Sequence, residues 1–440
     1  MRRRSDEERG WSVHFHHHSV TDVDEFRGKG RRHSERKEDG VTIQFHGLVG
    51  KIFVGIMITL FVLAALITLL VTLYNTVPAF RQFVNHNILH MQEDGDGIPI
   101  EPSTVVTVTE LKDLEVAFLD VGQGDCILIC FPDGRNMLID SGDTSNANKK
   151  VIGDALEERN ITRIDYLLAT HKDADHVGNM EYIFANYEIK KFFRPNIMAN
   201  EDYLIAEYNE DNPTNPVTDL LPDDFNTGAE KGTQLYSRVM YDAYIEEGCV
   251  VERFNKNSDF AHKFIFEEQE YIYSIDFLTP VADVDDIEYS DANDYSPIML
   301  LTYGETKLLL TGDAETEMER EFLTHYTSNM DVDILKVGHH GSETSTSQAL
   351  LDLVNPEYAV IQCGNNKTYQ HPRQATLDRL YAEDITVYRT DNNGTILLTI
   401  EYRDLDVDGD VFDFVLANTD CSRNHIGKDT DYANGVLAVA

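Results

Sequence analysis

The chain has 440 residues, 42% of them hydrophobic and 10% aromatic, which is long enough for two or three domains with buried cores. Acidic residues outnumber basic residues by 77 to 37, leaving a net charge of −40 at pH 7. This balance argues against a broad nucleic-acid-binding surface, which would need Lys and Arg to neutralise phosphates. The five cysteines are too few and uneven to indicate a disulfide framework.

The N-terminal quarter predicts a membrane anchor. Residues 1–50 are rich in Arg, Ser, His and Gly and are expected to form a disordered arm. Within residues 51–75, the run from Ile52 to Tyr74 contains no charged residue. As a helix it would rise about 34 Å, enough to cross a bilayer. The alternative is a buried core helix, which the apolar character of every face disfavours.

The charges on either side of this segment predict its orientation. Residues 1–51 hold 11 Lys/Arg and 9 Asp/Glu, a net of +2, whereas the rest of the chain holds 26 basic and 68 acidic residues, a net of −42. The positive-inside rule then places the N-terminus in the cytoplasm. We therefore expect a single-pass protein of the cell membrane with its large domain outside the cell.

Residues 76–112 are expected to form a stalk, residues 113–404 a folded domain and residues 405–440 a tail. Strands are predicted at Leu114–Asp120, Asp125–Phe131, Arg135–Asp140, Ile164–Ala169, Tyr271–Phe277, Pro297–Tyr303, Thr306–Thr311, Val332–Val337, Tyr358–Cys363, Thr386–Arg389 and Thr395–Tyr402. Helices are predicted at Lys149–Arg159, Val177–Tyr187, Ala314–His325, Ser347–Leu353 and Gln374–Ala382. This order indicates an α/β fold in which two sheets pack face to face with helices outside.

Two local features carry further expectations. An acidic insertion at about 198–247 either shapes access to a site or is a decorative surface loop. Asn393-Gly394 predicts a tight hairpin between the last two strands.

Candidate metal ligands follow three apolar strands. The strand ending at Ala169 is followed within seven positions by His171, Asp173, Asp175 and His176. Further along, Asp313 follows a glycine, as do the paired His339 and His340. A solvated polar loop is the alternative for each segment alone, but the three together indicate a divalent metal site of imidazoles and carboxylates.

Six segments resemble one known family. They are residues 118–125 (FLDVGQGD), 138–142 (LIDSG), 170–178 (THKDADHVG), 308–313 (LLLTGD), 335–342 (LKVGHHGS) and 369–372 (YQHP). Together they are similar to the metallo-β-lactamase hydrolase superfamily, and within it to the extracellular hydrolase domain of ComEC-type competence proteins. The resemblance covers roughly residues 113–400 and implies an αββα sandwich with a two-metal site at one edge.

The resemblance also implies the ligands. Two divalent ions would be held by His171, Asp173, Asp175, His176, Asp313 and His339, with Asp313 bridging both. Asp140 would orient one of these ligands. Asp173 stands where most of the superfamily has a histidine, and Asn293–Ser296 stands in place of another. The donor set therefore shifts toward oxygen, so that Mn²⁺ or Mg²⁺ competes with Zn²⁺.

The implied chemistry is hydrolysis by a metal-bound hydroxide, because two ions about 4 Å apart lower the pKa of a shared water to roughly 7. The predicted catalytic residues are Asp175, as proton acceptor, and His340 and His371, as phosphoryl ligands or proton donors. A structural role is the alternative for both histidines. The glycine-rich residues 121–124 lack the Lys-Ser/Thr ending of a P-loop and are expected to form a turn.

These features predict a membrane-anchored extracellular phosphodiesterase or nuclease. Its substrate would be DNA or a wall polymer such as a teichoic acid. A choline phosphate esterase and a non-catalytic surface binding module are the alternatives. The acidic balance disfavours DNA unless the chain forms a local basic patch, for which the candidates are Lys172, Lys190, Lys191, Arg194, Lys336, Lys367 and Arg373.

Overall fold

The computed structural model describes residues 11–15, 41–45, 105–365, 367–403, 411–418 and 437–438. The chain divides into two units, Met1–Met91 and Gln92–Ala440. In the first unit, β1 (Trp11–Phe15) pairs antiparallel with β2 (Val41–Phe45). The expected membrane segment lies outside the described residues. Within the described ranges, no helix has the length and apolar character that a bilayer span requires.

Two large mixed sheets form the second unit. The nine-stranded sheet runs, in spatial order, through β13 (Val250–Arg253), β10 (Lys191–Arg194), β8 (Tyr166–Leu168), β6 (Asn136–Ile139), β5 (Ile127–Cys130), β4 (Leu114–Phe118), β21 (Ile396–Arg403), β22 (Val411–Asn418) and β23 (Leu437–Ala438). The eight-stranded sheet runs through β20 (Thr386–Arg389), β19 (Tyr358–Ile361), β18 (Ile334–Lys336), β17 (Thr306–Leu310), β16 (Met299–Tyr303), β15 (Gln269–Phe277), β14 (Phe260–Phe266) and β3 (Val106–Thr107).

Short elements complete the unit. Two small parallel pairs join β7 (Arg163–Ile164) to β9 (Glu188–Ile189) and β11 (Ile197–Met198) to β12 (Glu230–Lys231). The helices are α3 (Asn146–Glu158), α4 (Ala174–Val177), α5 (Met180–Asn186), α6 (Glu201–Asp211), α7 (Gln234–Ile245), α8 (Thr316–His325), α9 (Gln348–Val354), α10 (Gln374–Ala382) and α11 (Thr390–Asn393). Three single turns are η2 (Val284–Asp286), η3 (Asn293–Tyr295) and η4 (Gly338–Gly341).

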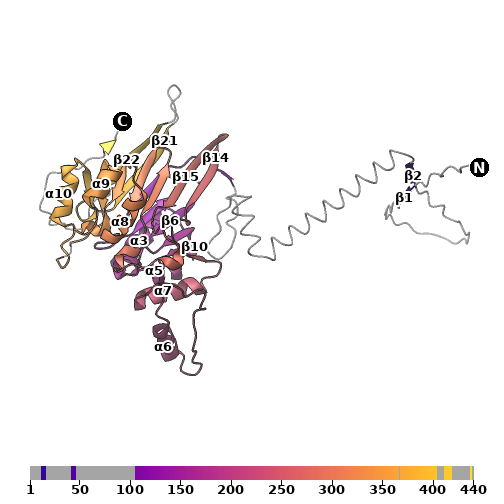
Figure 1. The fold of residues 1–440 in the computed structure, drawn as a ribbon, viewed down its shortest axis with the longest axis horizontal. Helices are drawn as coiled ribbons and strands as arrows, with labels where there is room; N and C mark the ends of the chain where they lie inside the picture. Colours follow the sequence, from indigo (N-terminus) through magenta and orange to yellow (C-terminus); the bar gives the residue numbers. More distant parts are fainter. Residues whose placement is uncertain are drawn as a thin grey trace, which may run out of the picture. The chain divides into compact units, whose positions relative to one another are not determined.

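Alternation along the strands produces the layers, because successive side chains point to opposite faces of a sheet. In β17, Leu308 and Leu310 pack in the core between the sheets, whereas Leu309 faces α8, α9 and α10. In β6, Met137 faces the central core and Leu138 faces α3 and α7. Figure 1 shows α8, α9 and α10 grouped together at the left of the sheets. The predicted α/β sandwich is confirmed.

The predicted hairpin at the end of the domain is wrong. β20 pairs in parallel with β19, while β21 pairs antiparallel with β4 in the other sheet. Asn393 and Gly394 do turn the chain, with φ of 70° at Gly394, but they end α11 and send the chain across the sandwich. The turn at Asn393-Gly394 was therefore predicted correctly, but the two strands that it joins pair in different sheets.

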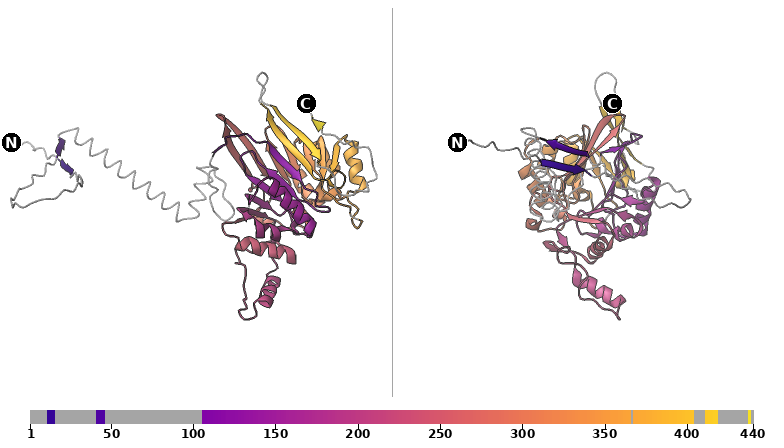
Figure 2. Two further views of the ribbon diagram at one scale, coloured as in Figure 1. Left: turned by 180° about the vertical axis from the view of Figure 1, so that it is seen from behind. Right: turned by 90° about the vertical axis from the view of Figure 1, so that its right-hand side faces the viewer.

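The acidic insertion belongs partly to the core. In α7, Tyr236, Val239 and Met240 are fully buried against the nine-stranded sheet. By contrast α6 extends beyond the sheets, at the far end of this unit (Figures 1 and 2). Strands β10, β13 and β14 also lie in the region where no regular element was predicted before Tyr271.

Candidate metal centre

The candidate ligands gather where several strands end. The loop after β8 carries His171, and α4 carries His176. Asp313 follows the end of β17 after Thr311 and Gly312. His340 lies in η4, directly after β18. Because β17 and β18 are parallel and β8 is parallel to β6, the loops at these strand ends meet at one edge of the sandwich.

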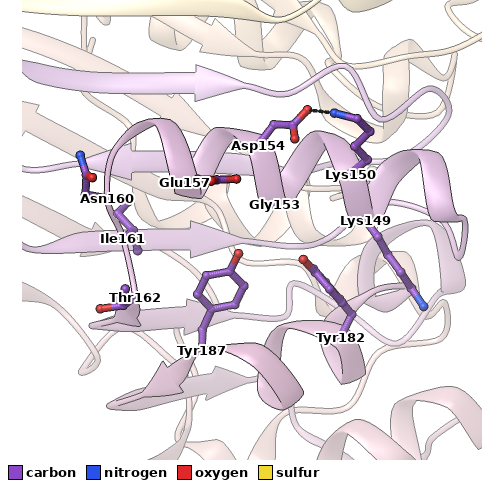
Figure 3. Close-up of a pocket in the computed structure, with 10 residues that line it drawn as sticks. All are labelled: Lys149, Lys150, Gly153, Asp154, Glu157, Asn160, Ile161, Thr162, Tyr182 and Tyr187. Atoms are coloured by element: carbon purple, nitrogen blue, oxygen red, sulfur yellow. Dashed lines mark hydrogen bonds and ion pairs between the residues drawn. The ribbon is translucent and has the colours of Figure 1, made fainter.

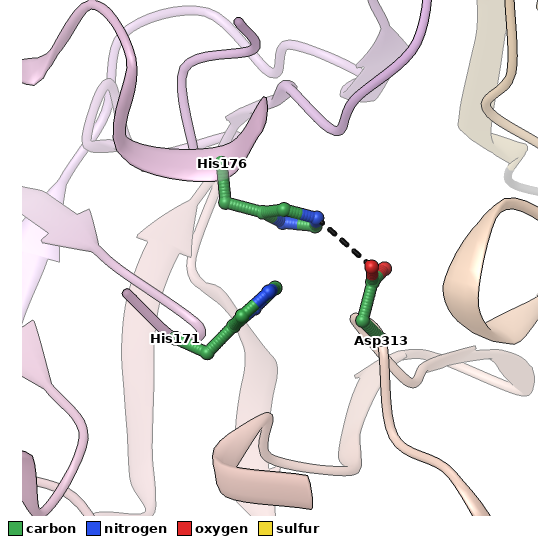
Figure 4. A group of neighbouring side chains, drawn as sticks. All are labelled: His171, His176 and Asp313. Atoms are coloured by element: carbon green, nitrogen blue, oxygen red, sulfur yellow. Dashed lines mark ion pairs between the residues drawn. The ribbon is translucent and has the colours of Figure 1, made fainter. Parts of the chain in front are cut away.

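His171, His176 and Asp313 form the first ligand group (Figure 4). All three are buried, and their ligand atoms lie within 4.8 Å of one another. His176 Nε2 is 3.1 Å from Asp313 Oδ2. The two histidine rings lie with their centroids 4.1 Å apart. The group therefore presents two imidazoles and one carboxylate to a common point.

A second group shares His176 and adds Asp175 and His340. His340 Nε2 lies 3.4 Å from Asp175 Oδ2 and 3.2 Å from Asp313 Oδ2. His340 is fully buried, whereas the Asp175 side chain is 32% exposed. Asp313 thus lies between the two groups, and Asp175 lies on the open side, where a substrate would enter.

Neighbouring groups orient the histidine ligands. His176 Nδ1 donates to Asp140 Oδ2 at 2.7 Å, and the Thr170 hydroxyl donates to the same oxygen at 2.7 Å. His340 Nδ1 donates to the Gln362 carbonyl at 3.0 Å. With Nδ1 protonated in both rings, each Nε2 lone pair is available to a metal.

The donor set fits a divalent cation. Four buried atoms, His171 Nε2, His176 Nε2, His340 Nε2 and Asp313 Oδ1, have no hydrogen-bond partner among the described residues. A buried polar atom without a partner destabilises a fold by about 1–3 kcal/mol. Four such atoms converging on one place are explained by a cation that accepts their lone pairs, and imidazole with carboxylate suits Zn²⁺ or Mn²⁺.

Backbone strain accompanies this arrangement. His339 and His340 both have positive φ, at 44° and 52°, a conformation that side-chain-bearing residues rarely adopt. Each such residue costs on the order of 1 kcal/mol and persists where the surroundings enforce it. At Gly124 the loop between β4 and β5 approaches so closely that an added Cβ would lie 2.3 Å from the Asp175 carbonyl oxygen. The glycine-rich turn therefore packs against the ligand loop.

Comparison with known proteins agrees with this geometry. The family profile described as "Metallo-beta-lactamase superfamily" matches residues 119–237, which include His171, His176 and the buried Asp140. The chain contains a metallo-β-lactamase superfamily domain. The profile begins directly after β4 and ends in the first turn of α7, so the ligands that follow strands of the eight-stranded sheet lie beyond it.

Two curated relatives each match along 64% of the chain. ComE operon protein 3 of Bacillus subtilis is 29% identical over 297 residues, which is 64% of this chain and 32% of the relative. Competence protein ComA of Neisseria gonorrhoeae is 26% identical over 281 residues, 64% of this chain and 31% of the relative. The chain thus spans about a third of each. Among solved structures, the metallo-beta-lactamase fold protein YhfI from Bacillus subtilis matches with a TM-score of 0.35 at 10% identity. The match covers 63% of this chain and 96% of YhfI.

Burial and charge set the protonation of the metal-free domain. Burial and the nearby His176 lower the pKa of His171 to about 3, so its imidazole is neutral at pH 7. Burial and the neighbouring His339 lower the pKa of His371 to about 4. For His340, burial acts to lower the pKa, but the Asp313 carboxylate outweighs it and the pKa lies well above its usual value. A cation bound to Asp313 would reverse this preference.

The predicted site residues lie at different distances from the centre. His171, Asp175, His176 and Asp313 fall into the ligand groups. His340, expected as a catalytic residue, falls there too. Asp173 and His339, expected as ligands, belong to none of the described ligand groups.

These two residues occupy the rim. Asp173 is 44% exposed and its Oδ2 lies 3.9 Å from His171 Nε2. His339 Nε2 lies 3.8 Å from Asp313 Oδ2, and its Nδ1 donates to Glu315 Oε1 at 2.6 Å. His371 contacts His339, with 5.1 Å between ring centroids. His371 thus lies beside the centre, where a substrate oxygen could meet it.

Several contributing residues were not predicted. Ser296 Oγ lies 3.2 Å from His171 Nδ1 and accepts from Asp313 N at 3.2 Å. Gln362 accepts from His340 and donates to the Cys126 carbonyl at 2.9 Å. Ser296 ends the segment Asn293–Ser296 that the resemblance had singled out, but its contacts were not predicted. Gln362 carries no local signal, since only the folded chain brings it to the ligands. Asp125 ends the resembling segment 118–125, but no role was predicted for it.

The predicted basic patch is wrong in part. Lys336 and Arg194 are buried, so neither reaches the surface. Lys172, Lys190 and Lys191 are ion-paired with Glu230, Glu188 and Glu252. Lys367 and Arg373 are the members that keep no ion-pair partner among the residues the structure describes. Charge composition alone could not distinguish these groups, because pairing and burial are tertiary properties.

A hollow of about 550 Å³ lies away from the centre, between α3 and the residues that follow it (Figure 3). Its lining includes Lys149, Tyr182 and Tyr187. None of the candidate metal ligands lines it. The size of this hollow therefore does not mark the site of the chemistry.

Proposed function

We propose that the chain is a metal-dependent phosphodiesterase that acts on nucleic acid. The observation that carries the proposal is the convergence of buried imidazole and carboxylate atoms from His171, His176, His340 and Asp313, which contact one another but have no hydrogen-bond partner among the described residues. Such a donor set has no use in an apolar core, because each atom without a partner is unfavourable there. This donor set lies at the edge of the sandwich where the strands end, and Asp175 exposes it to solvent there. Such a position suits a site for hydrolysis.

The residues would divide the work as follows. His171, His176, Asp175, Asp313 and His340 would hold the ions, and Zn²⁺, Mn²⁺ or Mg²⁺ bound there would supply a water of lowered pKa and neutralise phosphoryl charge. Asp140 fixes the His176 ring through its 2.7 Å hydrogen bond.

His371 would act outside the ion-binding groups. Its lowered pKa keeps it neutral at pH 7, so it is suited to donate a hydrogen bond to a phosphoryl oxygen rather than to act as a cation. It lies beside His339, on the rim. A substrate phosphate at the centre would then be contacted from the ion side and from the His371 side.

A short surface strip supports nucleic acid as the substrate. Residues 367–373, which we name the rim strip, carry Lys367, Tyr369 and Arg373 on either side of His371. Tyr369 is 57% exposed, and its ring centroid lies 5.9 Å from that of His371. An exposed aromatic ring between cationic side chains is how proteins hold single strands, with bases stacked and phosphates neutralised.

The rim strip is anchored to the centre. Arg373 N donates to the Gly341 carbonyl at 2.8 Å, one residue beyond His340. An added Cβ on Gly341 would lie 2.5 Å from Pro372 Cβ, so the two segments are in close contact. Similarity to a protein named for competence supports testing DNA first among candidate substrates. A wall polymer is the other phosphodiester to test.

The decisive assay is hydrolysis of bis-p-nitrophenyl phosphate by the full chain after chelation and re-addition of Mn²⁺, Mg²⁺ or Zn²⁺. Turnover that needs metal and is lost in Asp313→Ala and His176→Ala supports the proposal. Retained turnover in both variants contradicts this site. A folded, metal-loaded protein without turnover points to a binding module.

Substrate class is then tested with single-stranded DNA against poly(glycerol phosphate). Tyr369→Ala is expected to raise KM about tenfold on DNA and to leave poly(glycerol phosphate) unaffected, since one base stack contributes about 1–3 kcal/mol. Tyr369→Phe is the matched control, because it keeps the ring. Equal effects on both substrates would contradict base stacking.

We further propose that residues 51–75 anchor the protein in the cell membrane with its metal site outside. The apolar run and the basic flank support this orientation. Protease added to intact cells should remove the metallo-β-lactamase domain and leave the N-terminal arm protected. Protection of both parts would contradict the proposal.

A further inference from the structure

Beneath the ligand groups lies a lysine that is completely buried. Lys336, the last residue of β18, is 0% exposed, although a lysine is among the residues least often found inside a protein. An ammonium group there must be compensated by specific partners, because an unpaired buried charge is strongly unfavourable. Its partners are therefore informative.

Lys336 contacts two of the loops that carry ligands. Its Nζ forms an ion pair with Asp125 Oδ2 and donates to the Gly312 carbonyl at 3.1 Å. The Gly312 carbonyl belongs to the peptide unit that leads into Asp313, where φ of 48° at Gly312 makes the turn sharp. One ammonium thus connects the eight-stranded sheet, the turn before Asp313 and the start of β5.

Asp125 passes this connection to two further ligands. Its Oδ1 lies 3.3 Å from His340 Nδ1, and its backbone N–H donates to the Asp175 carbonyl at 3.2 Å. Asp125 is itself 1% exposed. Lys336 therefore has direct or one-step contacts with the segments that hold Asp313, His340 and Asp175.

We propose that Lys336 is a positioning residue for the metal centre, acting through Asp125 and the Gly312–Asp313 peptide. The inference rests on the proposed metal site and goes beyond it in naming what holds the ligands in place. The Lys336–Asp125 pair joins the two sheets at the edge where the ligands meet. It thereby fixes the distance between ligands contributed by different sheets.

Two physical effects of removing the lysine have opposite signs. Loss of one positive charge near the ions would by itself tighten metal binding, by Coulomb's law. Loss of positioning would weaken it, since residues that support ligands typically contribute about 10–100-fold in affinity. The double variant Asp125→Asn with Lys336→Met removes one charge of each sign and leaves the net charge unchanged. Because Asp125 also lies in groups that could hold a metal, Asp125→Asn alone measures the loss of that carboxylate, and the difference between the two variants reports the effect of Lys336.

The experiment is isothermal titration of the metal-free full chain with Mn²⁺, together with urea unfolding of the metal-free form. Lys336→Met alone removes the ammonium that compensates the buried Asp125 carboxylate and is expected to lower stability sharply. The double variant is expected to recover most of that stability, yet to bind Mn²⁺ about 10–100-fold more weakly than the unaltered chain. Lys307→Met is the matched control, because Lys307 lies in β17 of the same sheet. This variant should bind Mn²⁺ as tightly as the unaltered chain.

Each result decides the matter. A double variant that folds and binds Mn²⁺ as tightly as the unaltered chain overturns the positioning role. A double variant that does not fold also overturns it, and makes the pair a structural link only. If the unaltered chain binds no metal, the proposed function fails instead, independently of Lys336.

Discussion

His339 and His340 are neighbours in sequence with different surroundings in the fold. Both have left-handed backbone conformation, yet only His340 directs Nε2 between Asp175 and Asp313. His339 turns its Nδ1 to Glu315 and is 22% exposed. Two adjacent histidines in a sequence are only weak evidence for a metal site, and the sequence does not show which of the two is buried among the ligands.

This difference predicts unequal effects of substitution. His340→Ala removes a buried ligand atom and is expected to weaken Mn²⁺ binding by about 100-fold or more, since outer groups alone account for about 10–100-fold. His339→Ala, the adjacent control, should cost about tenfold or less. Titration of each metal-free variant measures both. Equal losses, or a larger loss for His339→Ala, would contradict the assignment.

Asp242, on α7, makes stability depend on pH. Burial, with repulsion from Glu181, raises its pKa to about 7, against an ordinary value of 3.8, while Arg238 acts in the opposite direction and Glu246 in the same one. A folded-state pKa above the unfolded value means that the unfolded chain releases the proton first. The contribution of Asp242 to stability is therefore complete below about pH 4 and lost as the pH rises through 7.

Replacing this carboxyl should remove that dependence. Asp242→Asn is expected to raise Tm at pH 8 and to reduce the difference in Tm between pH 5 and pH 8. Asp211→Asn, at the exposed end of α6, is the control and should leave both unchanged. Scanning calorimetry at the two pH values is the measurement, and an unchanged Tm at pH 8 would show that Asp242 is solvated.

At the scale of elements, a single arginine fastens the insertion to the sheet. Arg194, at the end of β10, is 3% exposed. Its guanidinium donates to the carbonyls of Thr227 at 3.0 Å and of Phe225 at 3.0 Å, and also to that of Ile197 at 3.1 Å. These bonds hold the turn between α6 and β12 against the strand.

Loss of this side chain should loosen the insertion. Arg194→Met leaves several buried carbonyls without donors and is expected to lower the free energy of unfolding by about 2–4 kcal/mol. Limited proteolysis should then cut within residues 212–232. Lys190→Met, which removes an exposed ion pair, should cost less than about 1 kcal/mol. Similar losses in the two variants would contradict the role given to Arg194.

At the scale of the whole molecule, charge and metal binding are linked. A chain with a net charge of −40 is destabilised by self-repulsion, which both screening and bound cations relieve. A specific site adds a separate contribution, because a ligand at 100 times its Kd stabilises the folded state by about 2.7 kcal/mol.

Mn²⁺ is therefore expected to raise Tm by several degrees more than NaCl at equal ionic strength. Asp313→Ala should keep the NaCl effect and lose the additional Mn²⁺ effect, since only the site is altered. Thermal unfolding of the chelated chain in both salts tests this. Equal shifts in the two salts would indicate screening alone.

The sequence by itself determined the elements and the kinds of ligand. Apolar runs ending in His, Asp and Gly predicted the strands that end at the site, because strand period and turn preference are local properties. It could not tell that β20 and β21 enter different sheets, since pairing depends on distant edges. It could not tell that Lys336 is buried beneath the centre instead of facing a substrate. Those facts depend on contacts between residues far apart in the chain, which only the tertiary structure decides.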